Sequence, residues 1–179
     1  MRKITSVVER CNTIATFRRI AVWAMETTAR WTPITPEMEV KVTLGRHIWE
    51  YAQMADALGK RTFELRQPEH YTLPAAEAYE ALMKDVAKTE TTAGRIAAMY
   101  DGMIPGLITR FQNYIAATDP ILDEPTAAIM ERIVTDLQRQ LKDIETLRGE
   151  VTLAKGAGAA IAAREKAIDT ILAEQKVAA

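Results

Sequence analysis

Apolar residues three or four positions apart recur through most of this chain of 179 residues. This spacing places them on one face of an α-helix, so the sequence predicts long amphipathic helices. The sequence contains no alternating strand pattern and no internal repeat. We therefore predict an all-α protein. Charged residues off the apolar stripes, such as Glu50 and Asp136, are expected on its surface.

Prolines, glycines and short polar segments separate the expected helices. The four long stretches with helical periodicity cover residues 4–31, 37–66, 75–116 and 124–149. Short breaks between long helices favour antiparallel neighbours. We therefore predict an antiparallel four-helix bundle over residues 1–149, with the alanine-rich residues 150–179 as a C-terminal helical extension.

Individual residues predict where these helices begin and bend. Thr35 and Asp123 are candidate N-caps of the second and fourth helices, because their side chains can accept a free amide of the first turn. Pro36 would then occupy the first helical position, which tolerates proline. Pro105 should kink or divide the third helix, because it lacks an amide donor. The glycine-containing residues 155–158 are expected to form a loose hinge before a fifth helix.

The composition argues against several classes of partner. The formal net charge is −1 and the pI is about 6.2, which gives no electrostatic case for nucleic acid or an anionic membrane. Cys11 is the only cysteine, so the chain can hold neither an internal disulfide nor a thiolate metal site. No apolar run approaches the roughly 20 residues that span a bilayer. We expect a cytoplasmic protein with no nucleic-acid or membrane partner.

Two segments resemble a bacterial group of ferritin-like proteins. Residues 35–66 carry the phrases PEMEVK, GRHIW and ADAL, and residues 116–141 carry the phrase ATDPILDEPT. The resemblance extends over about residues 15–144, which is most of the chain. It implies a ferritin-like bundle and, in the wider class, oxidative chemistry with iron and O₂.

The resemblance also implies where a dinuclear metal centre would lie. Ferritin-like proteins use one glutamate from each of two helices and a Glu-x-x-His pair from each of the other two. The pairs would fall at Tyr51 and Met54, and at Leu137 and Gln140, so this sequence departs from the pattern at all four positions. Tyrosine, methionine and leucine cannot replace carboxylate and imidazole as ligands of Fe²⁺ or Mn²⁺. We therefore expect no metal and no other cofactor.

Three further polar residues belong to the predicted site. Glu26 and Glu90 are the candidates for the two single carboxylates, and His47 lies one helical turn before Tyr51 on the same face. His47 is a candidate catalytic acid/base because histidine titrates near neutral pH, with Tyr51 and Glu90 as orienting groups. His47 can equally be a core histidine whose ring is satisfied by a neighbouring acid such as Glu26 or Glu90.

These observations leave three hypotheses of different kinds. The leading one is a ferritin-like bundle without a complete metal site, which binds a small, partly apolar molecule in the former metal cavity or forms a homodimer through its long helices. Glu26, Met54, Leu137 and Gln140 would line that cavity. The alternative is an oxidoreductase or cofactor-independent enzyme that uses His47 as acid/base. The third is a structural role, in which polar core residues only fix the helix register.

Overall fold

A computed structural model describes residues 5–151 and 158–174 of the chain. Within these two ranges the regular secondary structure is helical, apart from one antiparallel bridge that pairs Ala75 with Leu172. The prediction of an all-α protein is therefore confirmed. The predicted hinge at 155–158 lies outside the described residues, except for its last residue.

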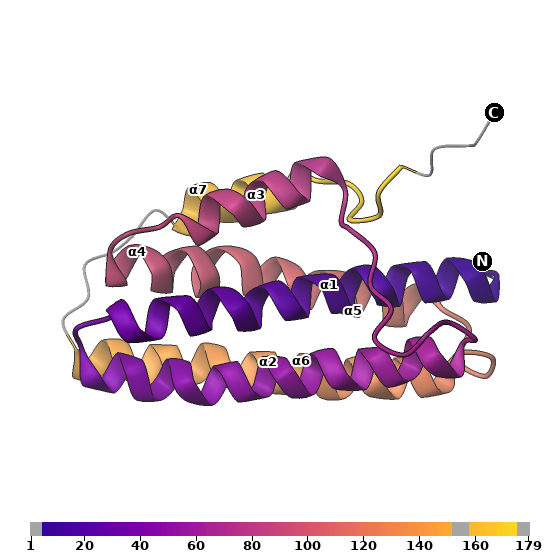
Figure 1. The fold of residues 1–179 in the computed structure, drawn as a ribbon, viewed down its shortest axis with the longest axis horizontal. Coiled ribbons are helices and arrows are strands. Elements are labelled where there is room, and N and C mark those ends of the chain that lie inside the picture. Colours follow the sequence, from indigo (N-terminus) through magenta and orange to yellow (C-terminus); the bar gives the residue numbers. More distant parts are fainter. Residues whose placement is uncertain (1–4, 152–157, 175–179) are drawn as a thin grey trace.

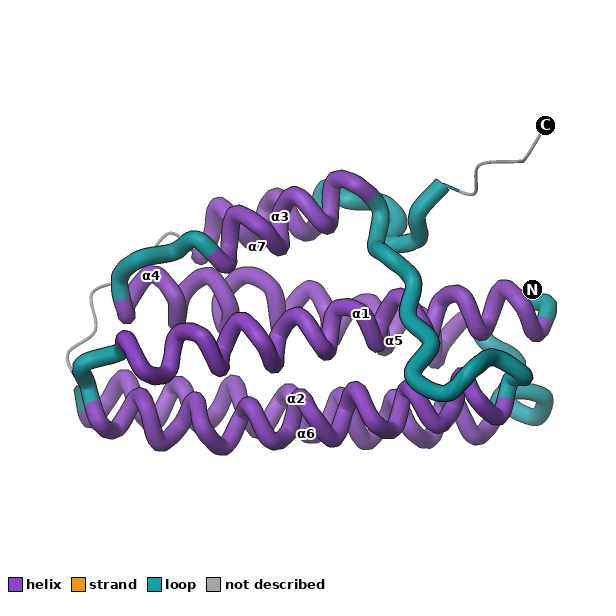
Figure 2. The backbone as a smooth tube through the Cα atoms, viewed as in Figure 1, coloured by secondary structure: helices purple, strands orange, loops and turns teal. Residues whose placement is uncertain are grey.

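Four long helical segments lie lengthwise beside one another (Figure 1). They are α1 (Val7–Trp31), α2 (Met38–Glu64), a run from residue 92 to residue 117, and α6 (Glu124–Glu150). The run joins α4 (Thr92–Ile96), the π-helical segment η2 (Ala97–Met103) and α5 (Ile104–Ala117). Figure 2 shows this run as one continuous helical path.

The short breaks predicted that each long segment would run antiparallel to the one before it, and one pair of successive segments departs from this. A shorter helix, α3 (Glu77–Ala87), carries the chain back along the outside, so that the 92–117 run has the same direction as α2 (Figure 1). Thr92 accordingly lies beside the start of α2, where its hydroxyl donates to Glu37 at 2.8 Å. The fold thus consists of two antiparallel pairs, α1 with α2 and the 92–117 run with α6, joined by one long crossover.

The predicted helix over residues 75–116 is two separate elements. α3 ends at Ala87, and the next helix has Thr91 as its N-cap, whose hydroxyl accepts the Gly94 amide at 3.1 Å. The Arg95 side chain donates to the Thr89 carbonyl at 3.0 Å and so stabilises the turn between the two helices. The apolar periodicity continues across this turn, and it concealed the cap signal at residues 91–94.

Pro105 stands at the start of α5, directly after the π-helical segment η2. Proline inside a helix removes one amide donor and crowds the carbonyl four residues earlier. A π-helical turn is one way in which a helix accommodates such a break. The expected disturbance at Pro105 is present as a locally widened helix.

The starts of α2 and α6 also differ in detail from the predictions. The N-cap of α2 is Glu37 rather than Thr35. Thr35 is buried, and its hydroxyl donates to the Trp31 carbonyl at 2.9 Å, within the turn that follows α1. Asp123 is the N-cap residue of α6, but its side chain accepts no amide of the first turn.

The buried carboxylate of Asp123 instead joins helices at one end of the bundle. It accepts hydrogen bonds from the hydroxyls of Tyr114 (2.6 Å), Thr118 (2.7 Å) and Thr126 (2.5 Å), and the Arg61 guanidinium lies at 3.5 Å. Burial alone would raise the pKa of Asp123, but these three hydroxyls, helped by nearby positive charge, lower it. An ionised carboxylate thus holds α2, α5 and α6 together at this end.

The helix α7 (Gly158–Lys166) packs with α3 as a second layer over the bundle (Figure 1). Its contact with η2 is close, because a Cβ added at Gly102 would stand 2.5 Å from Cγ2 of Ile161. The Arg110 side chain of α5 also bonds to Glu165 of α7, both to its carboxylate (2.5 Å) and to its carbonyl (2.8 Å). The C-terminal extension therefore includes a helix that packs firmly on the bundle.

Candidate functional site

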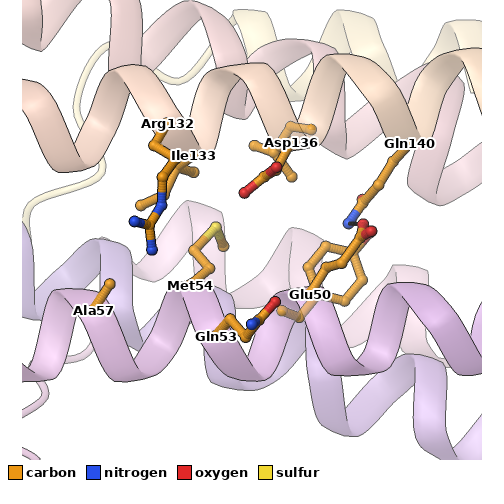
Figure 3. A pocket seen from close by; sticks show the side chains of 10 residues that line it. Glu50, Gln53, Met54, Ala57, Arg132, Ile133, Asp136 and Gln140 are labelled. Atoms are coloured by element: carbon orange, nitrogen blue, oxygen red, sulfur yellow. Dashed lines mark hydrogen bonds between the residues drawn. The ribbon is translucent and has the colours of Figure 1, made fainter.

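A groove of about 260 Å³ lies between α2 and α6 (Figure 3). Its lining residues are Glu50, Tyr51, Gln53, Met54, Ala57, Arg132, Ile133, Asp136, Leu137 and Gln140. All ten belong to α2 or α6, so the site is a groove between two neighbouring helices and not a cavity enclosed by four. We refer to it below as the α2–α6 groove.

The floor of the α2–α6 groove is apolar and its sides are polar. Met54, Ile133 and Leu137 are buried members of the hydrophobic core, and they present their side chains to the groove. Arg132 lies toward one end and Glu50 toward the other, as the side chains in Figure 3 show. An apolar surface with a few polar groups around it is the usual composition of a small-molecule site.

The acidic end of the groove is held by a network that crosses from α6 to α2. The amide nitrogen of Gln140 donates to Oε2 of Glu50 at 2.9 Å, and the Arg139 guanidinium donates to Oε1 at 3.0 Å. The same Arg139 nitrogen lies 2.9 Å from Oδ1 of Asp136. Two carboxylates on facing helices therefore share one guanidinium group.

Two residues that line the groove each have a buried polar atom that makes no hydrogen bond within the described part of the chain. These atoms are the Gln140 side-chain oxygen and the Tyr51 hydroxyl, both on residues with at most 1% exposure. The Gln140 amide presents its nitrogen to Glu50, because the opposite orientation would place its oxygen against the Glu50 carboxylate. Buried polar atoms are seldom left unpaired. These two have almost no exposed surface, so a molecule in the groove would reach them only if neighbouring side chains moved.

His47 lies behind the groove, inside the bundle, and is completely buried. Its Nδ1 is 2.7 Å from the Tyr100 hydroxyl of η2, and its Nε2 is 3.4 Å from Oδ2 of Asp143 on α6. Burial lowers the pKa of His47 below its ordinary value, although the bond to Asp143 acts in the opposite direction. His47 is therefore neutral at physiological pH, with both ring nitrogens engaged.

The two tyrosines between His47 and the groove are also neutral. Burial raises the pKa of Tyr51 well above its usual value, and it raises that of Tyr100 as well. The hydroxyls of Tyr51 and Tyr100 lie near one another, which raises the pKa of Tyr51 further and lowers that of Tyr100 in part. The Tyr51 hydroxyl nevertheless makes no hydrogen bond of good geometry. Each phenol can thus act as a proton-bearing hydrogen-bond group at neutral pH, and neither supplies a negative charge.

The structure brings four of the predicted site residues together and separates two others from them. Tyr51, Met54, Leu137 and Gln140 all line the α2–α6 groove. Glu26 is instead exposed on α1, where its carboxylate lies 3.8 Å from Arg30.

Glu90 is exposed in the turn between α3 and α4. The expectation that Glu26 and Glu90 face His47 and the cavity is therefore wrong. Glu26 lies off the buried stripe of α1, and Glu90 lies in a break that periodicity did not reveal.

Three polar residues of the site were not expected there. Glu50 has a side chain only 11% exposed and belongs to the groove rather than to the outer surface. Asp143 follows Gln140 by three positions, a spacing that places both on one face of α6 and that could have identified it. Tyr100 approaches His47 from η2, and apolar periodicity gives no signal for a side chain presented by a π-helical turn.

The side chains of this region do not suit a dinuclear metal centre. Among the residues that the structure describes, no group of three or more His, Cys, Asp or Glu lies close enough together to hold a metal ion. At the groove, Met54 and Leu137 occupy positions where the ferritin-like pattern requires hard or imidazole ligands. We therefore derive no chemistry through iron or manganese.

Comparison with protein-family models, with curated proteins and with solved structures finds no match for this chain. The resemblance to ferritin-like proteins accordingly remains a prediction from the sequence. Within the described ranges, no helix is both long enough and apolar enough to cross a membrane.

Proposed function

We propose that this protein binds a small, partly apolar molecule in the α2–α6 groove. The observation that carries the proposal is a groove of about 260 Å³ with a core-derived apolar floor and with Glu50, Asp136 and Arg132 among its polar lining residues. Apolar contact would supply affinity, and the polar lining residues would orient the ligand. The volume is small, so the ligand is expected to be a small metabolite rather than a large cofactor.

We further propose that the bundle is a ferritin-like fold that has lost its dinuclear site. Two antiparallel helix pairs joined by one long crossover are the topology that ferritin-like bundles use. The four positions of the two expected Glu-x-x-His pairs also gather at one place between α2 and α6. Both observations support the proposal, and core-forming residues at those positions would keep the bundle stable without metal.

The geometry favours binding over catalysis by His47. His47 does not line the α2–α6 groove, and its two ring nitrogens already have partners in Tyr100 and Asp143. A general base must reach the proton that it removes, directly or through one water. A catalytic role for His47 would therefore require its ring to leave both partners.

Filling the groove tests the proposed function. Ala57 lines the groove, so Ala57→Phe should place a ring in the ligand volume, whereas Ala29→Phe adds the same ring at an exposed position on α1. Isothermal titration calorimetry would compare both variants with the unmodified protein against six-carbon compounds bearing an amine, a hydroxyl or a carboxylate. We expect Ala57→Phe alone to abolish binding. Absence of binding by the unmodified protein, or equal binding by all three proteins, would refute the proposal.

A second candidate role is self-association through the outer face of α2. Met38, Val42 and Trp49 are large apolar residues exposed by 64%, 62% and 65%, and their spacing of four and seven places them on one helix face. Exposed apolar residues grouped on one face are a common feature of protein interfaces. We propose that this face pairs with a second copy of the chain, as the homodimer hypothesis expects.

A further inference from the structure

We propose that two copies of this chain pair through α2 in antiparallel orientation, and that Trp49 of each copy enters a second groove on the other copy. The inference rests on the self-association proposed above, because it assigns the orientation of the partner and the residue that the partner contributes. The second groove, called the Arg46 groove below, has a volume of about 450 Å³. Its lining includes Met38, Val42, Thr43 and Arg46 from the first part of α2, and Asp143 and Leu147 from the last part of α6.

A narrow stripe along α2 beside the Arg46 groove is open to a neighbouring helix. Its members, at spacings of four, three and four, are Met38, Val42, Gly45 and Trp49. This alternation is the one by which two packed helices contact each other along their length. All four residues are exposed, and a Cβ added at Gly45 would have no atom within 4 Å. The middle of the stripe therefore presents no side chain that would hold a second helix away.

The positions of Trp49 and the Arg46 groove along α2 determine the orientation of the pair. Trp49 follows Val42 by seven positions, about 10 Å along the helix axis. In a parallel pair with twofold symmetry each residue meets its own copy, so Trp49 would meet Trp49 and both grooves would stay empty. In an antiparallel pair whose axis passes between Gly45 and Arg46, Trp49 lies opposite Val42 at both ends. The antiparallel pair therefore fills both grooves.

The side chains of the Arg46 groove suit an indole ring. Val42 and Leu147 supply apolar surface, and a large aromatic side chain gains most of its binding energy from such contact. The Arg46 guanidinium lies 3.3 Å from Oδ2 of Asp143, and its side chain is 54% exposed, so its flat face can stack on the ring. Glu39 also lines the groove and can accept the indole N–H, which needs an acceptor when buried. Each copy thus carries both the ring and the groove that receives it.

Iodide quenching of tryptophan fluorescence tests whether Trp49 becomes buried in the pair. Trp23 and Trp31 are only 6% and 3% exposed, so Trp49, at 65%, is the tryptophan that iodide can reach in a single chain. We expect the quenching constant of the unmodified protein to fall about threefold over the concentration range in which sedimentation velocity shows the dimer forming. A dimer whose Trp49 stays as open to iodide as in the monomer would overturn the proposal.

Blocking the Arg46 groove tests the other half of the contact. Thr146 is an exposed lining residue, so Thr146→Phe places a ring in the groove and leaves Trp49 in place. Thr135→Phe adds the same ring at an exposed position of α6 outside the groove and is the control. Thr146→Phe and Trp49→Ser should each weaken self-association about tenfold or more, whereas Thr135→Phe should change it little. All three variants should retain the native melting temperature, because all three positions are exposed.

A mixture of the two weakened variants distinguishes this contact from other ways of pairing α2. In the mixture, Thr146→Phe supplies an intact Trp49 and Trp49→Ser supplies an intact groove, so the mixture should associate more tightly than either variant alone. A dimer that Thr146→Phe leaves intact, or a mixture that gains nothing, would overturn the groove assignment and leave self-association through α2 standing. An unmodified protein that is monomeric at all concentrations would refute both. Neither result affects ligand binding in the α2–α6 groove, which Ala57→Phe tests separately.

Discussion

The side-chain amide of Gln140 on α6 donates a hydrogen bond of 2.9 Å to the carboxylate of Glu50 on α2. This bond crosses the groove between the two helices and lies next to an unpaired acceptor, the Gln140 oxygen. It connects the packing of the bundle to the proposed binding site, because any change at Gln140 alters both.

Gln140→Glu should destabilise the protein by about 2 kcal/mol at pH 8, because it buries a second carboxylate against Glu50. In the folded variant the pKa of this carboxyl pair would lie above the ordinary value. The loss of stability caused by Gln140→Glu should therefore become smaller as the pH falls toward 4. Urea unfolding at several pH values measures both effects. Gln138→Glu, at an exposed position of α6, is the control and should change stability little. Equal stability of the two variants at pH 8 would contradict the Gln140–Glu50 contact.

The burial of His47 predicts a pH dependence of stability. Its folded-state pKa lies below the ordinary value of about 6.5, so its neutral form is favoured by folding. The stability that the folded protein gains by keeping His47 neutral is complete above about pH 6.5. It is lost as the pH falls below that value, because the unfolded chain then binds more protons than the folded one. His47→Gln should therefore flatten the decline in unfolding free energy between pH 7 and pH 5.

A matched histidine provides the control for this measurement. His70 is exposed in the connection after α2 and has a positive φ of 65°. His70→Asn preserves that backbone conformation, since asparagine tolerates the left-handed region. Its pH profile separates the effect of removing a buried histidine from the effect of removing an exposed one. If the unfolding free energy falls between pH 7 and pH 5 as much in His47→Gln as in the unmodified protein, His47 is not held neutral by burial.

The close contact of α7 with η2 predicts a steric effect at Gly102. Gly102→Ala would place a methyl group 2.5 Å from Cγ2 of Ile161, so α7 must move away or repack. We expect a loss of about 1–3 kcal/mol and faster amide hydrogen exchange in residues 158–166. Gly45→Ala meets no atom within 4 Å and should instead stabilise α2 by up to about 1 kcal/mol. Unchanged exchange in α7 after Gly102→Ala would contradict the packing.

The exposed face of α2 predicts concentration-dependent self-association. Trp49→Ser should shift sedimentation velocity profiles toward the monomer, because it removes the largest apolar side chain of that face. Ile121→Ser, in the connection before α6, changes an even more exposed side chain and should have no effect. A monomer at all concentrations for the unmodified protein would end the homodimer hypothesis.

Periodicity alone was enough to predict the helices that bury a continuous apolar stripe. α1, α2 and α6 end close to their predicted limits. A proline or glycine lies near each end, and such residues interrupt the apolar periodicity: Pro33 for α1, Pro68 for α2 and Gly149 for α6. The order of the segments could not be predicted in this way. A short helix such as α3 has the same local pattern as a bundle helix, and only tertiary contacts make it a crossover.

The site was predictable where residues share a helix face and not where they depend on another element. The pairs Tyr51 with Met54 and Leu137 with Gln140 lie three positions apart, so each pair presents itself to the same groove. The partner of His47 was not predictable, because Tyr100 reaches it from η2. Which acid lies near a histidine depends on the rotation of each helix about its axis, and the apolar stripe defines that rotation only coarsely.

Methyl NMR of the methionines tests the binding site most directly. Met54 lies on the floor of the groove, whereas Met38 is exposed near the start of α2 outside it. Titration with hexylammonium, hexan-1-ol and hexanoate should shift the Met54 methyl signal in a saturable way for at least one of the three probes. The Met38 signal should stay in place, and Ala57→Phe should abolish the Met54 shift. A Met54 signal that none of the three probes moves would contradict a ligand site between α2 and α6.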